Sequence, residues 1–163
     1  MKKIFLTTLI FSVVSCSVSE VPIDSLVERN GIVYQVNSDK PYSGKAIDYY
    51  ANGQAAYIET YKKGRVVQTE DYSSNGTLEY KDFYKDDVQT GGEEYWENGQ
   101  LAYRWSNDNV DDRGVTRLYN GNGFEEEYYE NGQLAYKTTY KNGEVVNEEV
   151  YKENGEKIDA SNY

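Results

Sequence analysis

Asn-Gly pairs recur along the chain at nearly constant spacing, and this spacing is the strongest constraint on its fold. They are separated by 23, 23, 33 and 23 residues and begin at Asn52, Asn75, Asn98, Asn131 and Asn154. A tyrosine stands three residues before each of these asparagines, so the flanking sequence keeps the same register. A fixed period of this length is typical of repeat proteins, in which each unit stacks on the next. The sequence therefore predicts an array of similar units with one interruption.

Asn-Gly between alternating apolar and polar residues favours a β-hairpin with a type I′ turn, because both central residues then need a positive φ. Such a tip is predicted at each pair, with structural turn residues Gly53, Gly76, Gly99, Gly132 and Gly155. A second turn is expected half a period later, in TYKKGRVV (60–67), FYKDDVQT (83–90) and TYKNGEVV (139–146). Two strands and two turns per unit predict an all-β fold: an elongated antiparallel β-meander of stacked hairpins in a single-layer, twisted sheet.

Two-residue loops also predict which side chains share a face, because successive residues of a strand point to opposite sides. In the fourth unit Tyr129 would face Leu134, and Tyr128 would face Ala135. The predicted packed face comprises Tyr50, Ala55, Tyr57, Leu78, Tyr80, Trp96, Leu101, Tyr103, Tyr129, Leu134 and Tyr136. Since only 38% of the residues are hydrophobic, we expect no single thick core and assign most burial to stacked tyrosine rings.

The opposite face is predicted to carry a half-exposed row of rings, Tyr49, Tyr95 and Tyr128. These are candidate binding residues for a sugar or a protein side chain, because tyrosine combines apolar area with a polar tip. Cross-strand packing is the alternative explanation, since it accounts for the period without any ligand.

The amino terminus has the pattern of a secretory signal. Residues 1–15, MKKIFLTTLIFSVVS, contain two lysines, an apolar run too short to cross a bilayer, and small residues. We therefore divide the chain into a signal peptide at 1–15, a lipidated amino terminus and tether at 16–28, and a repeat domain at 29–163. Residues 17–28 show no firm periodicity and include Pro22, which suits a tether.

Cys16 is the only cysteine, so an internal disulfide is excluded. Val13-Val14-Ser15-Cys16 resembles a bacterial lipoprotein box, which implies a lipidated Cys16 and an acyl anchor in membrane lipid. The expected location is the bacterial cell envelope, at the outer membrane, on its periplasmic or surface side. An incidental cysteine beside an ordinary cleavage site is the alternative.

The charge balance argues against nucleic acid as a partner. The formal net charge is −11 for the full sequence, and removing residues 1–15 takes away Lys2 and Lys3 but no acid, which gives −13. Binding to phosphates requires clustered lysine and arginine. An anionic lipid surface should also repel such a chain unless an acyl anchor holds it there.

YYENGQLAYKTTYKNGEVV (128–146) and its copies resemble the variant form of the MORN repeat found in many bacterial lipoproteins. The segment NGIVYQVNSDKPYSGKAIDYYANGQ (30–54) is similar to the usual first unit. The resemblance implies a sheet of stacked hairpins that serves as a platform for binding or assembly. Members of the YwqK-like group are labelled antitoxins, so neutralisation of a toxic protein is a second function that the resemblance suggests.

Few residues are suited to catalysis or metal binding. The chain contains no histidine, which excludes histidine-based triads and metal sites, and we predict neither a cofactor nor a metal. Paired carboxylates could hydrolyse a glycan, and the candidates are Glu93, Glu94, Glu97, Glu125, Glu126, Glu127 and Glu130. The same residues keep exposed strands soluble, so we favour a non-enzymatic protein.

SNDNVDDRG (106–114) departs from the EF-hand calcium loop and is interpreted as a polar turn.

The interruption at 105–127 is the last candidate binding segment. It carries Asp108, Asp111 and Asp112 and is ten residues longer than the period requires. Extra length in an array commonly forms a loop on one face, and such loops often bind. We expect it to contact the partner together with Tyr95 and Tyr128, although a tolerated insertion without a role would look the same. The predicted function is a binding or scaffold module for a protein or a glycan.

Overall fold

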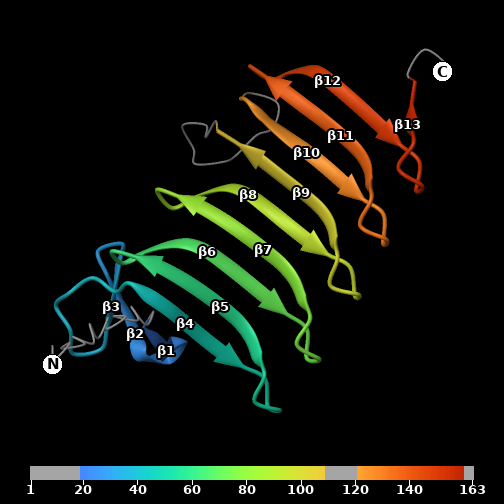
Figure 1. Cartoon of the computed structure of the whole chain (residues 1–163). Coiled ribbons are helices and arrows are strands. Elements are labelled where there is room, and N and C mark those ends of the chain that lie inside the picture. The colour runs from blue at the N-terminus through green and yellow to red at the C-terminus, as the bar shows by residue number, and fades with distance from the viewer. Residues whose placement is uncertain (1–18, 109–120, 160–163) are drawn as a thin grey trace, which may run out of the picture.

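The computed structural model describes residues 19–108 and 121–159 and contains one long open sheet (Figure 1). Its eleven strands follow the order β1-β4-β5-β6-β7-β8-β9-β10-β11-β12-β13. After β1 (Glu20–Pro22) they are β4 (Gly44–Tyr49), β5 (Ala55–Lys62), β6 (Arg65–Tyr72), β7 (Leu78–Lys85), β8 (Val88–Tyr95), β9 (Leu101–Asn107), β10 (Gly123–Tyr128), β11 (Leu134–Lys141), β12 (Glu144–Tyr151) and β13 (Lys157–Ile158). The predicted single-layer, all-β meander of hairpin repeats is confirmed.

The sheet is mixed rather than purely antiparallel, because its first strand runs parallel to β4. The segment after β1 forms a short 3₁₀ helix, η1 (Ile23–Ser25), and then a separate hairpin of β2 (Leu26–Arg29) and β3 (Ile32–Gln35). The sequence predicted a tether for residues 16–28. From Glu20 onward these residues instead cap the first edge of the array, because Val21, Ile23 and Leu26 supply apolar contacts that a tether would leave in water.

The turns at the Asn-Gly pairs differ from the prediction. In the first one the Gly53 N–H donates to the Tyr50 carbonyl at 2.9 Å, and the Tyr50 N–H donates to the Gln54 carbonyl at 2.8 Å. Only the glycine has a positive φ, +84° at Gly53 and between +80° and +86° at the four equivalent glycines. These features define a three-residue loop that ends in a G1 bulge. The predicted type I′ turn at these pairs is therefore wrong, although the need for glycine is correct.

Type I′ turns occur instead at the second turn of the three units in which the structure describes that turn. Lys63-Gly64, Asp86-Asp87 and Asn142-Gly143 all have positive φ at both residues, and the residues on either side of each pair face one another. Asp86 and Asp87 adopt this conformation, with φ of 51° and 66°, although neither is glycine. Asp87 also forms an ion pair with Arg65, the residue that follows the preceding Lys63-Gly64 turn.

The longer loops change which residues face one another. Tyr128 pairs with Leu134, and Glu127 pairs with Tyr136, because a bulge inserts Ala135 between the two pairs. The prediction had placed Leu134 and Tyr136 on one packed face. That prediction is wrong, since their partners are neighbours on one strand and therefore lie on opposite faces. The same shift occurs in the three preceding Asn-Gly hairpins.

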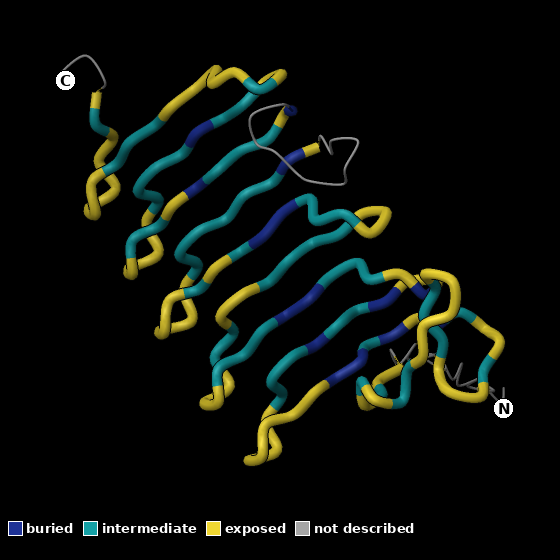
Figure 2. Tube along the Cα trace, turned by 180° about the vertical axis from the view of Figure 1, so that it is seen from behind, coloured by how far each residue is buried: buried dark blue, intermediate teal, exposed yellow. Residues whose placement is uncertain are grey.

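Buried hydrophobic residues are concentrated at the amino-terminal end of the array, whereas the buried positions further along it in Figure 2 are glycine or polar residues. The buried hydrophobic residues of the described chain are Tyr42, Ala46, Ile47, Ile58 and Tyr61. Val21, Ile23, Leu26, Val33 and Val66 pack against the cluster of Tyr42, Ala46 and Tyr61. Beyond β6, the described residues contain no such apolar cluster. Stability there must come from the sheet itself and from polar contacts between neighbouring strands.

The interruption does not disturb the sheet on either side of it. Strands β9 and β10 are paired from Tyr103↔Glu127 to Asn107↔Gly123. The Asp108 N–H donates to the Asn122 carbonyl at 3.0 Å, and the Asp108 carboxylate accepts bonds from the Asn122 N–H and side-chain amide at 2.8 and 2.9 Å. Asp108 and Asn122 thus close the neck of the inserted segment, so residues on both sides keep the repeat geometry.

Candidate functional site

One face of the sheet carries a cross-strand row in which acids and bases alternate. From β4 to β12 the paired residues are Ile47, Ile58, Glu70, Lys81, Glu93, Arg104, Glu126, Lys137 and Glu149. Opposite charges directly across a ladder attract each other, whereas like charges there would destabilise the sheet. We call the face with this row the ion-pair face.

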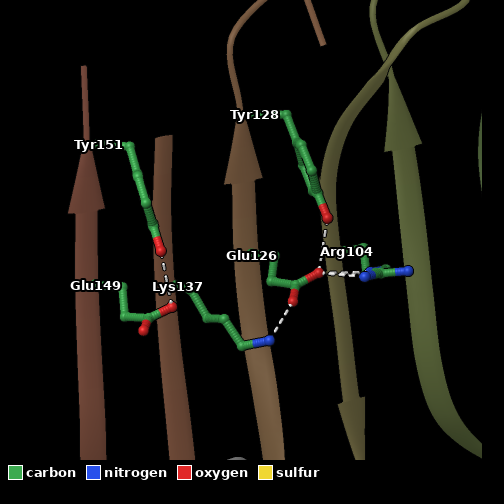
Figure 3. Close-up of polar contacts among 6 residues, drawn as sticks. All are labelled: Arg104, Glu126, Tyr128, Lys137, Glu149 and Tyr151. Carbon is green, nitrogen blue, oxygen red and sulfur yellow. Dashed lines mark hydrogen bonds and ion pairs between the residues drawn. The ribbon is translucent and has the colours of Figure 1, made fainter. Parts of the chain in front are cut away.

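Glu126 is the best-connected member of the row (Figure 3). Its carboxylate accepts hydrogen bonds from Arg104 Nε at 2.7 Å, Lys137 Nζ at 2.7 Å and the Tyr128 hydroxyl at 2.7 Å. Burial, which leaves Glu126 only 4% exposed, would raise its pKa, but the hydrogen bonds from Lys137, Tyr128 and Arg104 outweigh burial and the pKa lies below its ordinary value. Glu126 therefore stays ionised and paired, unlike a catalytic general acid.

The predicted row of half-exposed tyrosines lies on this ion-pair face. The hydroxyls of Tyr95, Tyr128 and Tyr151 donate to glutamates two residues earlier on the same strand, at 2.6, 2.7 and 3.1 Å. Burial, followed by the hydrogen bond to Glu126, raises the pKa of Tyr128 to about 12. Tyr49 differs, because Ile47 stands in the glutamate position and the ring is 53% exposed. Packing and ion-pair contacts thus account for Tyr95 and Tyr128.

The opposite face carries a row in which acids alternate with tyrosines. From β4 to β12 the row runs Asp48, Tyr57, Asp71, Tyr80, Glu94, Tyr103, Glu127, Tyr136 and Val150. The next row on the same side adds Glu59, Asp82, Trp105, Glu125 and Glu148. Within the described strands, neither row contains a lysine or an arginine. We call this the tyrosine–acid face.

The carboxylates of the tyrosine–acid face lack ion-pair partners among the described residues. Tyrosine hydroxyls donate to three of them: Tyr61 to Glu59 at 2.6 Å, Tyr103 to Glu125 at 3.2 Å and Tyr136 to Glu148 at 2.7 Å. The pKa of Asp71 is raised by burial and by the charge of Asp82. The amino-terminal cap covers this face near Ala46, Tyr61 and Val66. Further along, Tyr80 is 50% exposed, and Glu94 and Glu127 are exposed.

A stack of hydrogen bonds joins the Asn-Gly turns to one another. Each asparagine accepts a bond from the backbone N–H two residues later, as Asn131 does from Gln133 at 2.9 Å. The amides of Asn52, Asn98 and Asn131 also donate to backbone carbonyls of the next turn, at 2.8 to 2.9 Å. Two residues before those asparagines, Tyr50, Trp96 and Tyr129 donate to the next unit at 2.6, 3.2 and 2.9 Å. Asparagine is therefore required for its side chain, not for a left-handed backbone.

The stack is interrupted after the second Asn-Gly turn. Ser73 occupies the position of Tyr50, Trp96 and Tyr129. Its hydroxyl donates within its own turn to Asn75, and in the described chain neither Ser73 nor Asn75 bonds to the next turn. A groove of about 690 Å³ lies at this break. Its aromatic lining is Tyr80, Tyr95, Trp96, Tyr103 and Tyr128, and its acidic lining is Glu79, Glu94, Glu97 and Glu127.

The structure separates the residues predicted to bind together. Tyr95 and Tyr128 line the groove beside the Asn-Gly turns, whereas Tyr49 does not. Asp108 lies at the opposite end of β9, at the neck of the insertion. Asp111 and Asp112 fall in 109–120, and Cys16 with the predicted signal peptide falls in 1–18, so these lie outside the described residues. The glycines Gly53, Gly76, Gly99, Gly132 and Gly155 are at the predicted turns.

Residues 19–108 and 121–159 contain no group of three or more cysteine, aspartate or glutamate side chains arranged to hold a metal ion. No helix in these ranges has the length and apolar character needed to cross a membrane.

The sequence contains a signal for the ion-pair row that the prediction missed. Glutamate stands two residues before the repeating tyrosine in EDY (70–72), EEY (93–95), EEY (126–128) and EVY (149–151). A base also follows the tyrosine that stands five residues after the Asn-Gly asparagine, at Lys81, Arg104 and Lys137. Together these positions predict alternating charges across the sheet, provided that the bulges are placed correctly.

Comparison with known proteins supports the repeat assignment. Residues 42–63 and 122–142 match the family model described as MORN repeat variant. The first match covers β4, its Asn-Gly turn and β5, and the second covers β10, its turn and β11. No curated protein matches the chain. The hairpins at these two segments are therefore similar to variant MORN repeats, a family associated with binding and scaffold roles.

Proposed function

We propose that the chain is a non-enzymatic lipoprotein of the bacterial cell envelope, anchored through Cys16, whose repeat array binds a protein or glycan partner. The observation that carries this proposal is the tyrosine–acid face. It presents exposed rings and carboxylates beyond the amino-terminal cap, and the described strands supply it with no cation. On the ion-pair face, by contrast, Glu70, Glu126 and Glu149 have lysine or arginine partners.

Binding is favoured over catalysis by the state of the carboxylates. A glycosidase requires one carboxyl group held protonated near neutral pH and a second one ionised across the sugar. Glu126 is held ionised by three donors, and Glu94 and Glu127 are exposed on an open sheet. An open sheet excludes little water, which suits a recognition surface better than a reaction centre.

Affinity capture tests the partner. The tagged full chain is expressed in its host, membranes are solubilised, and captured proteins and glycans are identified by mass spectrometry. Glu94→Gln with Glu127→Gln should abolish capture, because both carboxylates are exposed on the tyrosine–acid face. The matched control is Glu144→Gln with Glu153→Gln. It removes the same amount of charge from exposed positions that belong to neither row of the tyrosine–acid face. Equal capture by both double variants would contradict the proposal.

Metabolic labelling with a fatty acid tests the anchor. Cys16→Ser should remove the label and leave the protein unprocessed or released from membranes, because a diacylglyceryl group needs the thiol. Undiminished label in the variant would contradict the lipoprotein assignment, whatever the capture experiment shows.

A further inference from the structure

The groove at the broken turn stack has an unusual charge pattern for this chain. Elsewhere the chain's own cations lie over its rings: Arg29 is 3.9 Å from the Tyr34 centroid, Arg104 is 5.4 Å from the Phe124 centroid, and Lys157 is 5.7 Å from the Tyr151 centroid. The groove combines five aromatic rings with four carboxylates. No lysine or arginine lines the groove. Arg104, whose charge acts on the Tyr128 hydroxyl, is itself hydrogen-bonded to Glu126 at 2.7 Å.

We propose that this groove receives lysine or arginine side chains from a basic segment of a partner polypeptide, an inference that rests on the proposed binding function. Charge complementarity selects this occupant, because the acidic lining residues Glu79, Glu94, Glu97 and Glu127 form no ion pair in the described chain. The rings add cation–π attraction, which is strongest for tryptophan and tyrosine. Tyr80 and Trp96 are 50% and 36% exposed and so are accessible to a ligand.

The electrostatic field in the groove agrees with this occupant. The pKa of the Tyr103 hydroxyl lies above its ordinary value, first because of burial, then because of Glu125, Glu127 and Glu94. A negative field of this kind favours a cation and gives a neutral sugar no comparable gain. The volume of about 690 Å³ is within the range of ordinary ligand pockets and accommodates a short peptide segment.

Ser73 gives a direct way to close the groove. In the equivalent turns Tyr50 and Tyr129 donate from their hydroxyls to the next unit. Ser73→Tyr should place a ring and a hydroxyl at the Tyr95 carbonyl, as the neighbouring repeats do. This change leaves the net charge unaltered, fills the groove, and should raise the melting temperature. A loss of binding could then not be attributed to unfolding or to a weaker overall attraction.

The test measures binding of a fluorescein-labelled peptide of alternating arginine and glycine to the full chain in detergent, by fluorescence anisotropy. A peptide with citrulline in place of arginine is the matched neutral probe, and a neutral N-acetylglucosamine oligomer tests the glycan alternative. We expect the arginine peptide to bind at least about tenfold more tightly than the citrulline peptide. Ser73→Tyr should weaken arginine-peptide binding by about tenfold or more, since it removes the cavity.

Two glutamates at equivalent turn positions distinguish binding in the groove from attraction of the peptide to the protein's overall negative charge. Glu97 lines the groove, and Glu153 holds the same position in the last turn, outside it. Glu97→Gln should weaken arginine-peptide binding by about fivefold, and Glu153→Gln by less than about twofold, because a solvent-exposed charge at a distance is screened. Equal effects of the two changes, unchanged affinity in Ser73→Tyr, or preference for the oligomer would each overturn the inference.

The outcomes distinguish this inference from the broader function. If Ser73→Tyr still captures the envelope partner while Glu94→Gln with Glu127→Gln does not, the tyrosine–acid face binds but the groove is not its receptor. If no variant changes capture, the proposed function itself fails. If Ser73→Tyr loses both the peptide and the envelope partner while its melting temperature rises, both proposals are supported.

Discussion

The two faces of the sheet are built from the same strands but differ in how their carboxylates are paired. On the ion-pair face, Glu126 lies between Arg104 and Lys137 and is buried. On the tyrosine–acid face, its neighbour Glu127 lies between Tyr103 and Tyr136 in the ladder and is exposed. Adjacent residues of one Glu-Glu-Glu run thus differ in burial and in partners. The difference indicates that one face pairs its carboxylates with cations, whereas the carboxylates of the other face have no such partner among the described residues.

This division fits a thin array with little apolar interior. Beyond β6 the described chain has no buried apolar cluster, so the ion-pair row and the stacked turns must replace the core that a thicker protein would have. Buried ion pairs contribute little net stability compared with apolar packing, but removing one member leaves the others without compensation. The two faces should therefore respond very differently to loss of a single carboxylate.

The largest expected effect separates Glu126 from Glu127. Glu126→Gln should lower the free energy of unfolding by about 2 kcal/mol at pH 7, less than for a fully buried pair because Arg104 and Lys137 remain partly in water. Glu127→Gln should change it by less than about 0.5 kcal/mol, as at other unpaired surface positions. Urea denaturation followed by circular dichroism measures both. Equal losses would show that the two faces do not differ.

The next largest loss of unfolding free energy is expected in the turn stack, whose hydrogen bonds belong to neither face. Asn131→Ala removes the bond from the Gln133 N–H and the bond to the Glu153 carbonyl, each 2.9 Å long. This should cost about 1 to 2 kcal/mol. Asn75→Ala removes bonds within its own turn, from the Thr77 N–H and the Ser73 hydroxyl, and no bond to the next turn. Asn75→Ala should cost less, because the Ser73 hydroxyl also donates to the Thr77 carbonyl at 3.2 Å and keeps a partner. An equal cost would show that the bond to the next turn adds no stability.

Acid titration should show a smaller effect, with opposite signs for the two faces. The folded-state pKa of Glu126 is lowered, so its contribution to stability is complete above the unfolded value of about 4.3 and is lost as the pH falls through the folded value. The difference between wild type and Glu126→Gln should therefore shrink below about pH 4. Thermal denaturation from pH 7 to pH 3 measures it, and a constant difference would contradict the assigned ion pairs.

The fold could be predicted from the sequence because the repeat period determines it. Assigning residues to the two faces also required the positions of the bulges, and the groove required the stacking of the turns. Type I′ turns were assigned to the Asn-Gly pairs because asparagine tolerates a positive φ. The actual reason is that Asn131 bonds across to the next turn, which is visible only once turns are stacked. The bulge at Ala135 then moves Leu134 to the side of Tyr128. A strict alternation rule has no means of anticipating that shift.

The groove shows a similar limit. Ser73 can be recognised in the sequence as a departure from the aromatic residue found at Tyr50, Trp96 and Tyr129, and Lys152 of the last turn is another. Whether a small residue at this position produces a groove depends on how neighbouring turns stack, which composition and spacing do not determine. The sequence predicts partner binding at the insertion because that segment is longer than the repeat period requires. Asp108 instead forms part of its neck with Asn122, at the far end of the strands from the groove.

The smallest expected effect lies on the tyrosine–acid face itself. The pKa of Asp71 is raised by burial and by the charge of Asp82, so the ionised carboxylate opposes folding at neutral pH. This cost develops as the pH rises above the unfolded pKa of about 3.9 and is complete above the folded value. Asp71→Asn should therefore raise the melting temperature slightly at pH 7, and the gain should vanish in acid as the wild-type carboxyl becomes protonated. Differential scanning calorimetry at both pH values measures it. A lower melting temperature for the variant at pH 7 would mean that the carboxylates of this face are paired for stability, as those of the ion-pair face are, and would remove the contrast on which the proposed binding surface rests.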